Sequence, residues 1–86
     1  MMNYTVTWTT RAERHLAAAW LAAPDRSAVT AAAHSLEQEV RRDPLGVGES
    51  RRSTVDRVAF RPPLGISYTV VADDLAVYVT AVWLIG

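Results

Sequence analysis

Residues 57–84, RVAFRPPLGISYTVVADDLAVYVTAVWL, decide the fold because apolar residues recur at alternate positions through most of the stretch. Pro62-Pro63 and Asp73-Asp74 interrupt this alternation, as turn residues do. The segments that remain are 57–61, 64–72 and 75–84. Strands joined by such short turns run antiparallel, so the stretch predicts a three-stranded meander.

The alternation also predicts which side chains share the more polar, open face of this sheet. We assign polar residues to that face because a half-buried strand turns its polar side to water. They are Arg57, Arg61, Ser67, Thr69, Tyr78 and Thr80. Tyr68 and Trp83 follow the opposite parity, so Tyr68 is expected in the core, and Trp83 is expected on the core side but partly exposed because it lies near the terminus.

The residues before the meander predict one further strand and a first helix. Residues 3–8, NYTVTW, alternate strictly and predict a half-buried strand. Thr10 followed by Glu13 fits a capping box at the start of a helix. Trp20 is expected to pack between this helix and the sheet, and Pro24 ends the helix.

A second helix is predicted between Asp25 and Asp43-Pro44. Asp25 is a favourable N-cap, and apolar residues recur at steps of three and four from Val29 to Val40. The many alanines of both helices favour a closely packed antiparallel hairpin. The predicted fold is therefore a single α+β domain over residues 1–86. Its order is β-α-α-β-β-β, with the helical hairpin on one face of a mainly antiparallel twisted sheet.

Composition excludes several kinds of chemistry. The 86 residues include no cysteine, so disulfides, thiolate metal sites and cysteine nucleophiles are ruled out. The net charge is zero, and all nine basic residues are arginine. His15 and His34 lack ligand-like spacing, so no metal and no cofactor is expected. The sequence shows neither a signal peptide nor an apolar membrane span, which predicts a cytoplasmic protein.

Several stretches resemble the toxins of the RelE/ParE superfamily, which belong to type II toxin–antitoxin systems and include plasmid stabilisation proteins. The stretches are Tyr4–Thr9 followed by Ala12-Glu13, Arg42–Pro44, Gly48–Arg51, Arg57-Val58, Pro63–Tyr68 and Val77–Val79. They follow the family's order and cover nearly the whole chain. The resemblance implies a small cognate antitoxin as partner. It also implies one of two targets, because one branch cleaves messenger RNA on the ribosome and the other inhibits DNA gyrase.

The resemblance also directs attention to particular residues. RNA cleavage of this kind needs a base, an acid and cations for the transition-state phosphate. The candidate catalytic residues are Arg57, Arg61 and Tyr78, and the candidate binding residues are Arg51, Arg52 and Trp83. Ala59 and Gly65 depart from the ribonuclease pattern, because they lack the charge that many members carry there.

Three interpretations stay open at this point. The chain is a ribonuclease toxin or a degenerate relative of one, a gyrase-inhibiting toxin, or a non-catalytic protein-binding module. In the third case the last strand would pair with another chain if it lies at a sheet edge. The arginines themselves have a simpler interpretation as solvated residues that pair with nearby acids.

Overall fold

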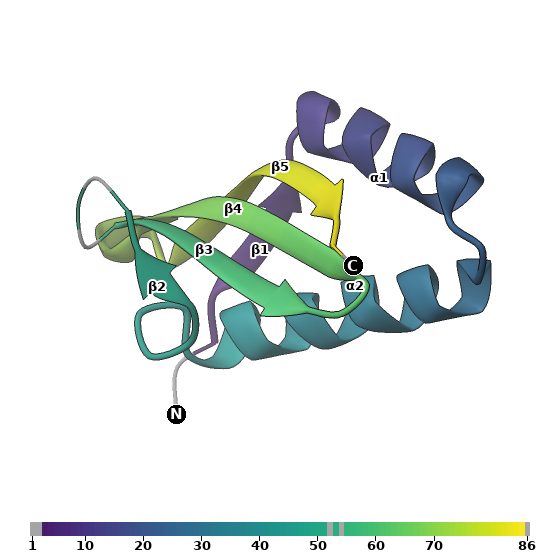
Figure 1. Cartoon of the computed structure of the whole chain (residues 1–86). Coiled ribbons are helices and arrows are strands. Elements are labelled where there is room, and N and C mark those ends of the chain that lie inside the picture. Colours follow the sequence, from purple (N-terminus) through teal and green to yellow (C-terminus); the bar gives the residue numbers. More distant parts are fainter. Residues whose placement is uncertain (1–2, 52, 54, 86) are drawn as a thin grey trace.

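The computed structural model describes residues 3–51, 53 and 55–85 and has an α+β architecture (Figure 1). In chain order the elements are β1 (Thr5–Trp8), α1 (Thr10–Ala22), α2 (Arg26–Arg42), β2 (Glu49–Ser50), β3 (Asp56–Arg61), β4 (Leu64–Val71), the short 3-10 helix η1 (Ala72–Asp74) and β5 (Ala76–Leu84). The five strands form one sheet in the order β1-β5-β4-β3-β2. Only β1 pairs in parallel, and the other neighbours are antiparallel. The predicted fold class is confirmed, with the two-residue strand β2 as an addition.

The last strand is an inner strand over its first half. Residues Ala76–Val79 pair with β1 on one side and with β4 on the other. These residues therefore do not meet the condition under which the strand would pair with another chain, a position at the edge of the sheet. Beyond Val79, β5 keeps β4 as a partner but has passed the end of β1.

A side chain caps the start of each helix. The N-cap of α2 is the predicted residue, whereas the N-cap of α1 is not. The Asp25 carboxylate accepts a hydrogen bond from the Ala28 amide at 3.1 Å, which confirms it as the N-cap of α2. The N-cap of α1 is Thr9, whose hydroxyl oxygen accepts from the Ala12 amide at 3.2 Å. The same hydroxyl donates to the Val79 carbonyl at 2.9 Å, so the sheet holds Thr9 in place. The capping box predicted with Glu13 is therefore wrong by one residue.

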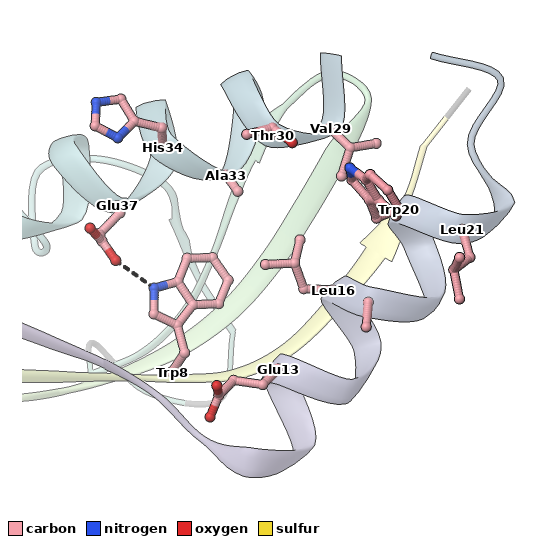
Figure 2. Close-up of a pocket in the computed structure, with 11 residues that line it drawn as sticks. Trp8, Glu13, Leu16, Trp20, Leu21, Val29, Thr30, Ala33, His34 and Glu37 are labelled. Atoms are coloured by element: carbon pink, nitrogen blue, oxygen red, sulfur yellow. Dashed lines mark hydrogen bonds between the residues drawn. The ribbon is translucent and has the colours of Figure 1, made fainter. Parts of the chain in front are cut away.

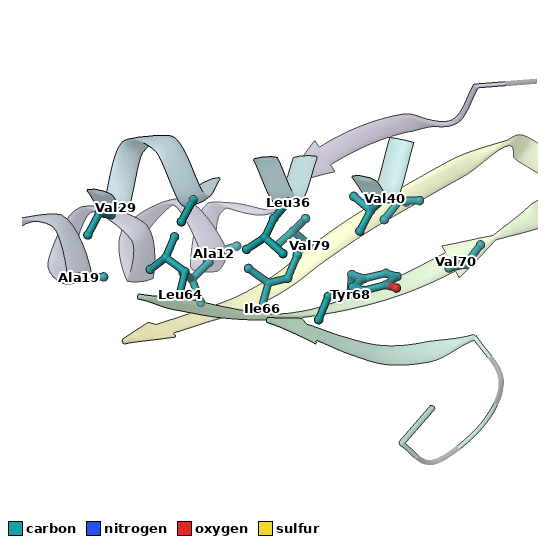
Figure 3. Close-up of a cluster of buried hydrophobic side chains, with 14 residues drawn as sticks. Ala12, Ala19, Val29, Leu36, Val40, Leu64, Ile66, Tyr68, Val70 and Val79 are labelled. Carbon is teal, nitrogen blue, oxygen red and sulfur yellow. The ribbon is translucent and has the colours of Figure 1, made fainter. Parts of the chain in front are cut away.

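The core lies between the helices and the face of the sheet that they cover (Figure 3). Its largest fully buried side chains include Tyr68, Leu36, Leu64 and Ile66. The Tyr68 hydroxyl lies within hydrogen-bond distance of the Pro44 carbonyl at 2.7 Å and the Val47 carbonyl at 2.8 Å. Burial raises the pKa of the Tyr68 hydroxyl above its ordinary value of 10.0, since a phenolate would lose its hydration.

The two helices run in opposite directions, but they are not packed closely along their length (Figure 1). Three alanines of the helices, Ala12, Ala19 and Ala32, are buried in the core shared with the sheet. The larger Leu16 and Trp20 line an open groove between α1 and α2. The predicted close hairpin is therefore wrong, because the alanines bring the helices near the sheet and not near each other.

A β-bulge in β5 changes which side chains face the core. Tyr68 lies opposite Val79, whereas Ser67 lies opposite Ala81, so Thr80 is an extra residue in β5. After the bulge the alternation is reversed, and Val82 is buried. Trp83 lies opposite Gly65 and turns to the open face, so its predicted side of the sheet is wrong, although its predicted partial exposure is confirmed.

The two arginines of β3 also lie on the opposite face from the one predicted. Directly opposite residues of an antiparallel pair share a face. Arg57 lies opposite the buried Tyr68, and Arg61 lies opposite the buried Leu64. Both arginines therefore belong to the face that the helices cover. The expected open-face positions of Ser67, Thr69, Tyr78 and Thr80 agree with the strand pairing and with the Ser67–Thr80 hydroxyl contact of 2.9 Å.

Candidate functional site

A broad open groove lies between α1 and α2. Its volume is about 810 Å³, and most of its lining is apolar. It is lined by Trp8, Glu13, Leu16, Ala17, Trp20, Leu21, Val29, Thr30, Ala33, His34 and Glu37 (Figure 2). An open apolar hollow with a few polar groups at its border is typical of a binding site.

Trp8 forms part of the groove and is held in one orientation. Its indole Nε1–H donates to Glu37 Oε1 at 2.7 Å (Figure 2). The second oxygen of this carboxylate, Oε2, accepts from Arg41 Nη2 at 3.2 Å. The network uses both carboxylate oxygens, so Glu37 links β1 to α2 and fixes the indole in place.

The opposite end of the groove is apolar and solvent-exposed. Trp20 is 40% exposed and Leu21 is 64% exposed, which is unusual for side chains of this size. The Arg26 guanidinium lies 4.6 Å from the centre of the Trp20 ring, a cation–π contact that holds the indole at the border of the groove. The prediction that Trp20 packs between helix and sheet is therefore wrong.

Charge is unevenly distributed along the groove. Glu13 and Glu37 lie beside Trp8 at one end, whereas Trp20 and Leu21 occupy the other (Figure 2). Since Glu13 does not serve in a capping box, its carboxylate contributes to the groove instead. This arrangement suits an amphipathic ligand that presents apolar side chains to one end and a cation to the other.

Arg57, a candidate catalytic residue, is only 8% exposed and holds the segment that follows α2. Its guanidinium donates to the Ser50 hydroxyl at 3.0 Å, to the Gly48 carbonyl at 3.1 Å and to the Val47 carbonyl at 3.4 Å. Gly48 has a φ of +73°, a conformation that glycine adopts without strain. These contacts tie β3 to the loop before β2.

The other two candidate catalytic residues lie away from each other. Arg61 forms an ion pair with Glu39 of α2, on the helix-covered side of the sheet. Tyr78 is 39% exposed and lies opposite Thr69 on the open face. The structure therefore does not bring Arg57, Arg61 and Tyr78 together on one surface.

The open face carries an aromatic pair that sequence reasoning did not find. The rings of Phe60 and Trp83 meet edge to face, with centroids 6.2 Å apart and an interplanar angle of 76°. Both residues lie opposite Gly65, and a Cβ atom there would come within 2.6 Å of the Trp83 indole. The lack of a side chain at Gly65 thus leaves space for the Trp83 ring. The signal in the sequence was a glycine within a strand, which often marks a close approach.

The remaining candidates are in the loop between β2 and β3. Arg51 is exposed, and its amide donates to the Asp56 carbonyl at 2.8 Å. Arg52 lies outside the described residues. Within those that are described, no cluster of three His, Cys, Asp or Glu side chains could hold a metal ion. No helix in the same part of the chain is long and apolar enough to cross a membrane.

Two helices on one face of a mixed five-stranded sheet define the class of this protein as a small α+β fold. No protein-family model and no curated protein matches the sequence. Among solved structures, the chain is similar to one in the crystal structure of the toxin–antitoxin complex RelBE2 from Mycobacterium tuberculosis. The two are 27% identical with a TM-score of 0.76, over 96% of this chain and 99% of that one. The chain therefore has a RelE-like toxin fold.

Proposed function

We propose that this chain is the toxin-like component of a type II toxin–antitoxin module, which works in the cytoplasm and is neutralised by a small antitoxin. The observation that supports this most directly is the likeness to a chain of a toxin–antitoxin complex over nearly the full length of both chains. A likeness in fold alone would not support a function, so the case also depends on the site.

The groove between α1 and α2 is the surface on which we place the antitoxin. An amphipathic helix fits such a groove by laying its apolar stripe along it. Trp20 and Leu21 provide exposed apolar area, and Trp8 is held in a fixed orientation by Glu37. Large aromatic side chains in fixed positions are typical of residues that dominate binding energy.

The carboxylates of Glu13 and Glu37 favour one orientation of the bound helix in the groove. Glu13 and Glu37 flank Trp8 at one end of the groove. A helix that carries a lysine or arginine at one end of its apolar stripe would place that cation between them, because opposite charges favour one orientation of binding. The proposed antitoxin segment is therefore an amphipathic helix with a basic residue beyond its apolar stripe.

We further propose that this chain acts on its target by protein contact and not by cleaving RNA. The support comes from where the cations lie. Strands β3, β4 and β5 are described throughout, and their arginines, Arg57 and Arg61, both lie on the helix-covered face. The open face presents the Asp56 carboxylate with the Phe60–Trp83 pair. On these three strands the open face carries no arginine that could stabilise a transition-state phosphate, and the Asp56 carboxylate repels a phosphate backbone.

The experiment is expression of the chain with and without the product of the adjacent small reading frame. We expect growth arrest by the chain alone and relief when both are expressed. Leu21→Glu should keep the arrest but lose the relief, because the charge enters the apolar end of the groove. Ala31→Glu is the matched control, since Ala31 is exposed on α2 but does not line the groove.

A different experimental result would contradict each part of the proposal. A chain that is harmless alone and binds neither adjacent gene product would overturn the toxin assignment. Full relief of the Leu21→Glu variant would place the antitoxin elsewhere. Primer extension on messenger RNA from arrested cells should show no new cleavage sites, and cuts that depend on this chain would refute action by contact alone. A supercoiling assay with purified gyrase then tests one such contact.

A further inference from the structure

The exposed side of α1 has the features that the groove between α1 and α2 selects in a ligand. Ala17, Trp20 and Leu21 form an apolar stripe on this helix and are exposed to solvent (Figure 2). The Arg26 guanidinium lies over the Trp20 ring, at the end of the stripe. An apolar helical stripe with a cation at its end fits an apolar groove that has carboxylates at its end. The chain therefore carries both a groove and a segment that matches it.

The two ends of the groove carry charges of opposite sign. Glu13 and Glu37 lie at the end beside Trp8, whereas Arg26 lies at the end beside Trp20. Neither Glu13 nor Arg26 forms an ion pair with another residue in the described part of the chain. Both charges are thus available to a partner. A surface that is acidic at one end and basic at the other is complementary to a second copy of itself that runs in the opposite direction.

We infer that a second copy of this chain covers the groove when no other partner occupies it. The two copies are related by a two-fold axis near Ala17, and their α1 helices run antiparallel. Glu13 and Leu21 are each four positions from Ala17. The axis therefore brings Glu13 of one copy to the end of the groove where Arg26 of the other copy lies. Ala17 has the smallest side chain that α1 contributes to the groove, so the two helices can approach closely at the axis.

Exposed apolar side chains provide the driving force for this contact. Trp20 is 40% exposed and Leu21 is 64% exposed, and the groove of the other copy would remove their apolar surface from water. The two-fold axis makes each of these contacts occur twice. An interface formed by one groove and one side of a helix is small, and small interfaces are typical of transient association. We therefore expect a dimer that dissociates on dilution.

The dimer has a consequence for the binding of an antitoxin. The antitoxin helix and the second copy would use the same groove, so binding of one excludes the other. A higher concentration of the free chain would favour the dimer and weaken the apparent affinity for the antitoxin. The dimer itself depends only on the groove, whereas this competition rests on the proposed function.

The test measures the mass of the purified full chain by light scattering over a range of concentrations. We expect Glu13→Arg and Arg26→Glu each to weaken the dimer by about tenfold or more, because each substitution turns two symmetric attractions into repulsions. An equal mixture of the two variants should form dimers again, since every contact between positions 13 and 26 of a mixed pair joins opposite charges. Recovery on mixing distinguishes contact between copies from a loss of folding in either variant.

A second pair of variants tests the apolar part of the contact. Leu21→Glu should abolish the dimer, whereas Ala31→Glu should not, because Ala31 is exposed on α2 outside the groove.

Several results would overturn the inference. A chain that stays monomeric at about 1 mM, where even a weak dimer forms, would leave the groove to other partners. A dimer that persists in Leu21→Glu would place the interface elsewhere, and a mixture of Glu13→Arg and Arg26→Glu that stays monomeric would refute the two-fold arrangement. If neither adjacent gene product binds the chain, the proposed function fails, but recovery on mixing would still establish the dimer. An adjacent gene product that binds without dissociating the dimer would overturn the competition.

Discussion

Replacing Arg57 by alanine should destabilise the protein strongly, although the residue looks like a surface cation in the sequence. The side chain is 8% exposed and donates to Ser50, Gly48 and Val47. A hydrogen bond to a charged group contributes about 1.5–3 kcal/mol, and such contributions are not additive. With one of the three at the long distance of 3.4 Å, we expect a loss of about 2–4 kcal/mol.

That loss is large for a chain of 86 residues. Native proteins of this size are stable by about 4–13 kcal/mol, so the variant would retain a much smaller margin. Urea unfolding followed by tryptophan fluorescence measures the change. With a slope of about 1–1.5 kcal/mol per molar urea, a loss of about 2–4 kcal/mol should lower the midpoint by about 1–4 M.

Arg61→Ala is the matched control from the same strand. Its ion pair with Glu39 is half exposed, and pairs of this kind contribute below about 1 kcal/mol. We therefore expect a small shift in its urea midpoint. An Arg57→Ala protein that unfolds at the wild-type midpoint would refute the structural role. If that same protein lost the ability to arrest growth, Arg57 would have to act on a target directly.

Three further changes test other parts of the fold. Gly65→Ala should cost about 1–3 kcal/mol and red-shift tryptophan fluorescence, because its Cβ would displace the Trp83 indole from Phe60; an unchanged spectrum and urea midpoint would contradict that contact. Burial favours the neutral Tyr68 hydroxyl, so the free energy of unfolding should fall as pH rises above 10.0, and urea titrations of Tyr68→Phe should show a smaller fall. If the free energy of unfolding fell equally with pH in the unsubstituted protein and in Tyr68→Phe, the Tyr68 hydroxyl would not be the cause of the fall. Thr9→Ala should lower stability by about 1 kcal/mol through loss of the N-cap, whereas Thr10→Ala, one residue later, should change it little.

The order of elements was predictable because it depends on local signals. The alternation of residues 64–79 and the N-cap at Asp25 each act over a few residues, and each appears where it was expected. The start of α1 was misplaced by one residue because Thr9 and Thr10 are equally good caps in isolation. Thr9 is the N-cap because its hydroxyl also donates to the Val79 carbonyl, which is 70 positions away in the sequence.

The faces of the sheet were less predictable because they depend on contacts between distant segments. Arg57 and Arg61 were assigned to the open face on the ground that charge marks the solvent side. Arg57 is buried nonetheless, since carbonyls of the loop before β2 satisfy its donors. The groove between α1 and α2 was not predicted from the sequence for a similar reason. Trp20 fits the apolar pattern of a helix, and only the separation of α1 and α2 leaves it exposed.

The bulge at Thr80 determines which side of the sheet every later residue of β5 faces. A strand of the same length without the bulge would alternate without interruption, and the side chains that follow would exchange sides. Trp83 would then enter the core beneath α1, Val82 would move to the open face, and the Val82 amide would no longer meet His15. Deletion of Thr80 would instead remove the bulge and leave Val82 and Trp83 on their present sides, opposite Ile66 and Gly65. Relatives of this fold should therefore be compared by their spacing here before their residue types are compared.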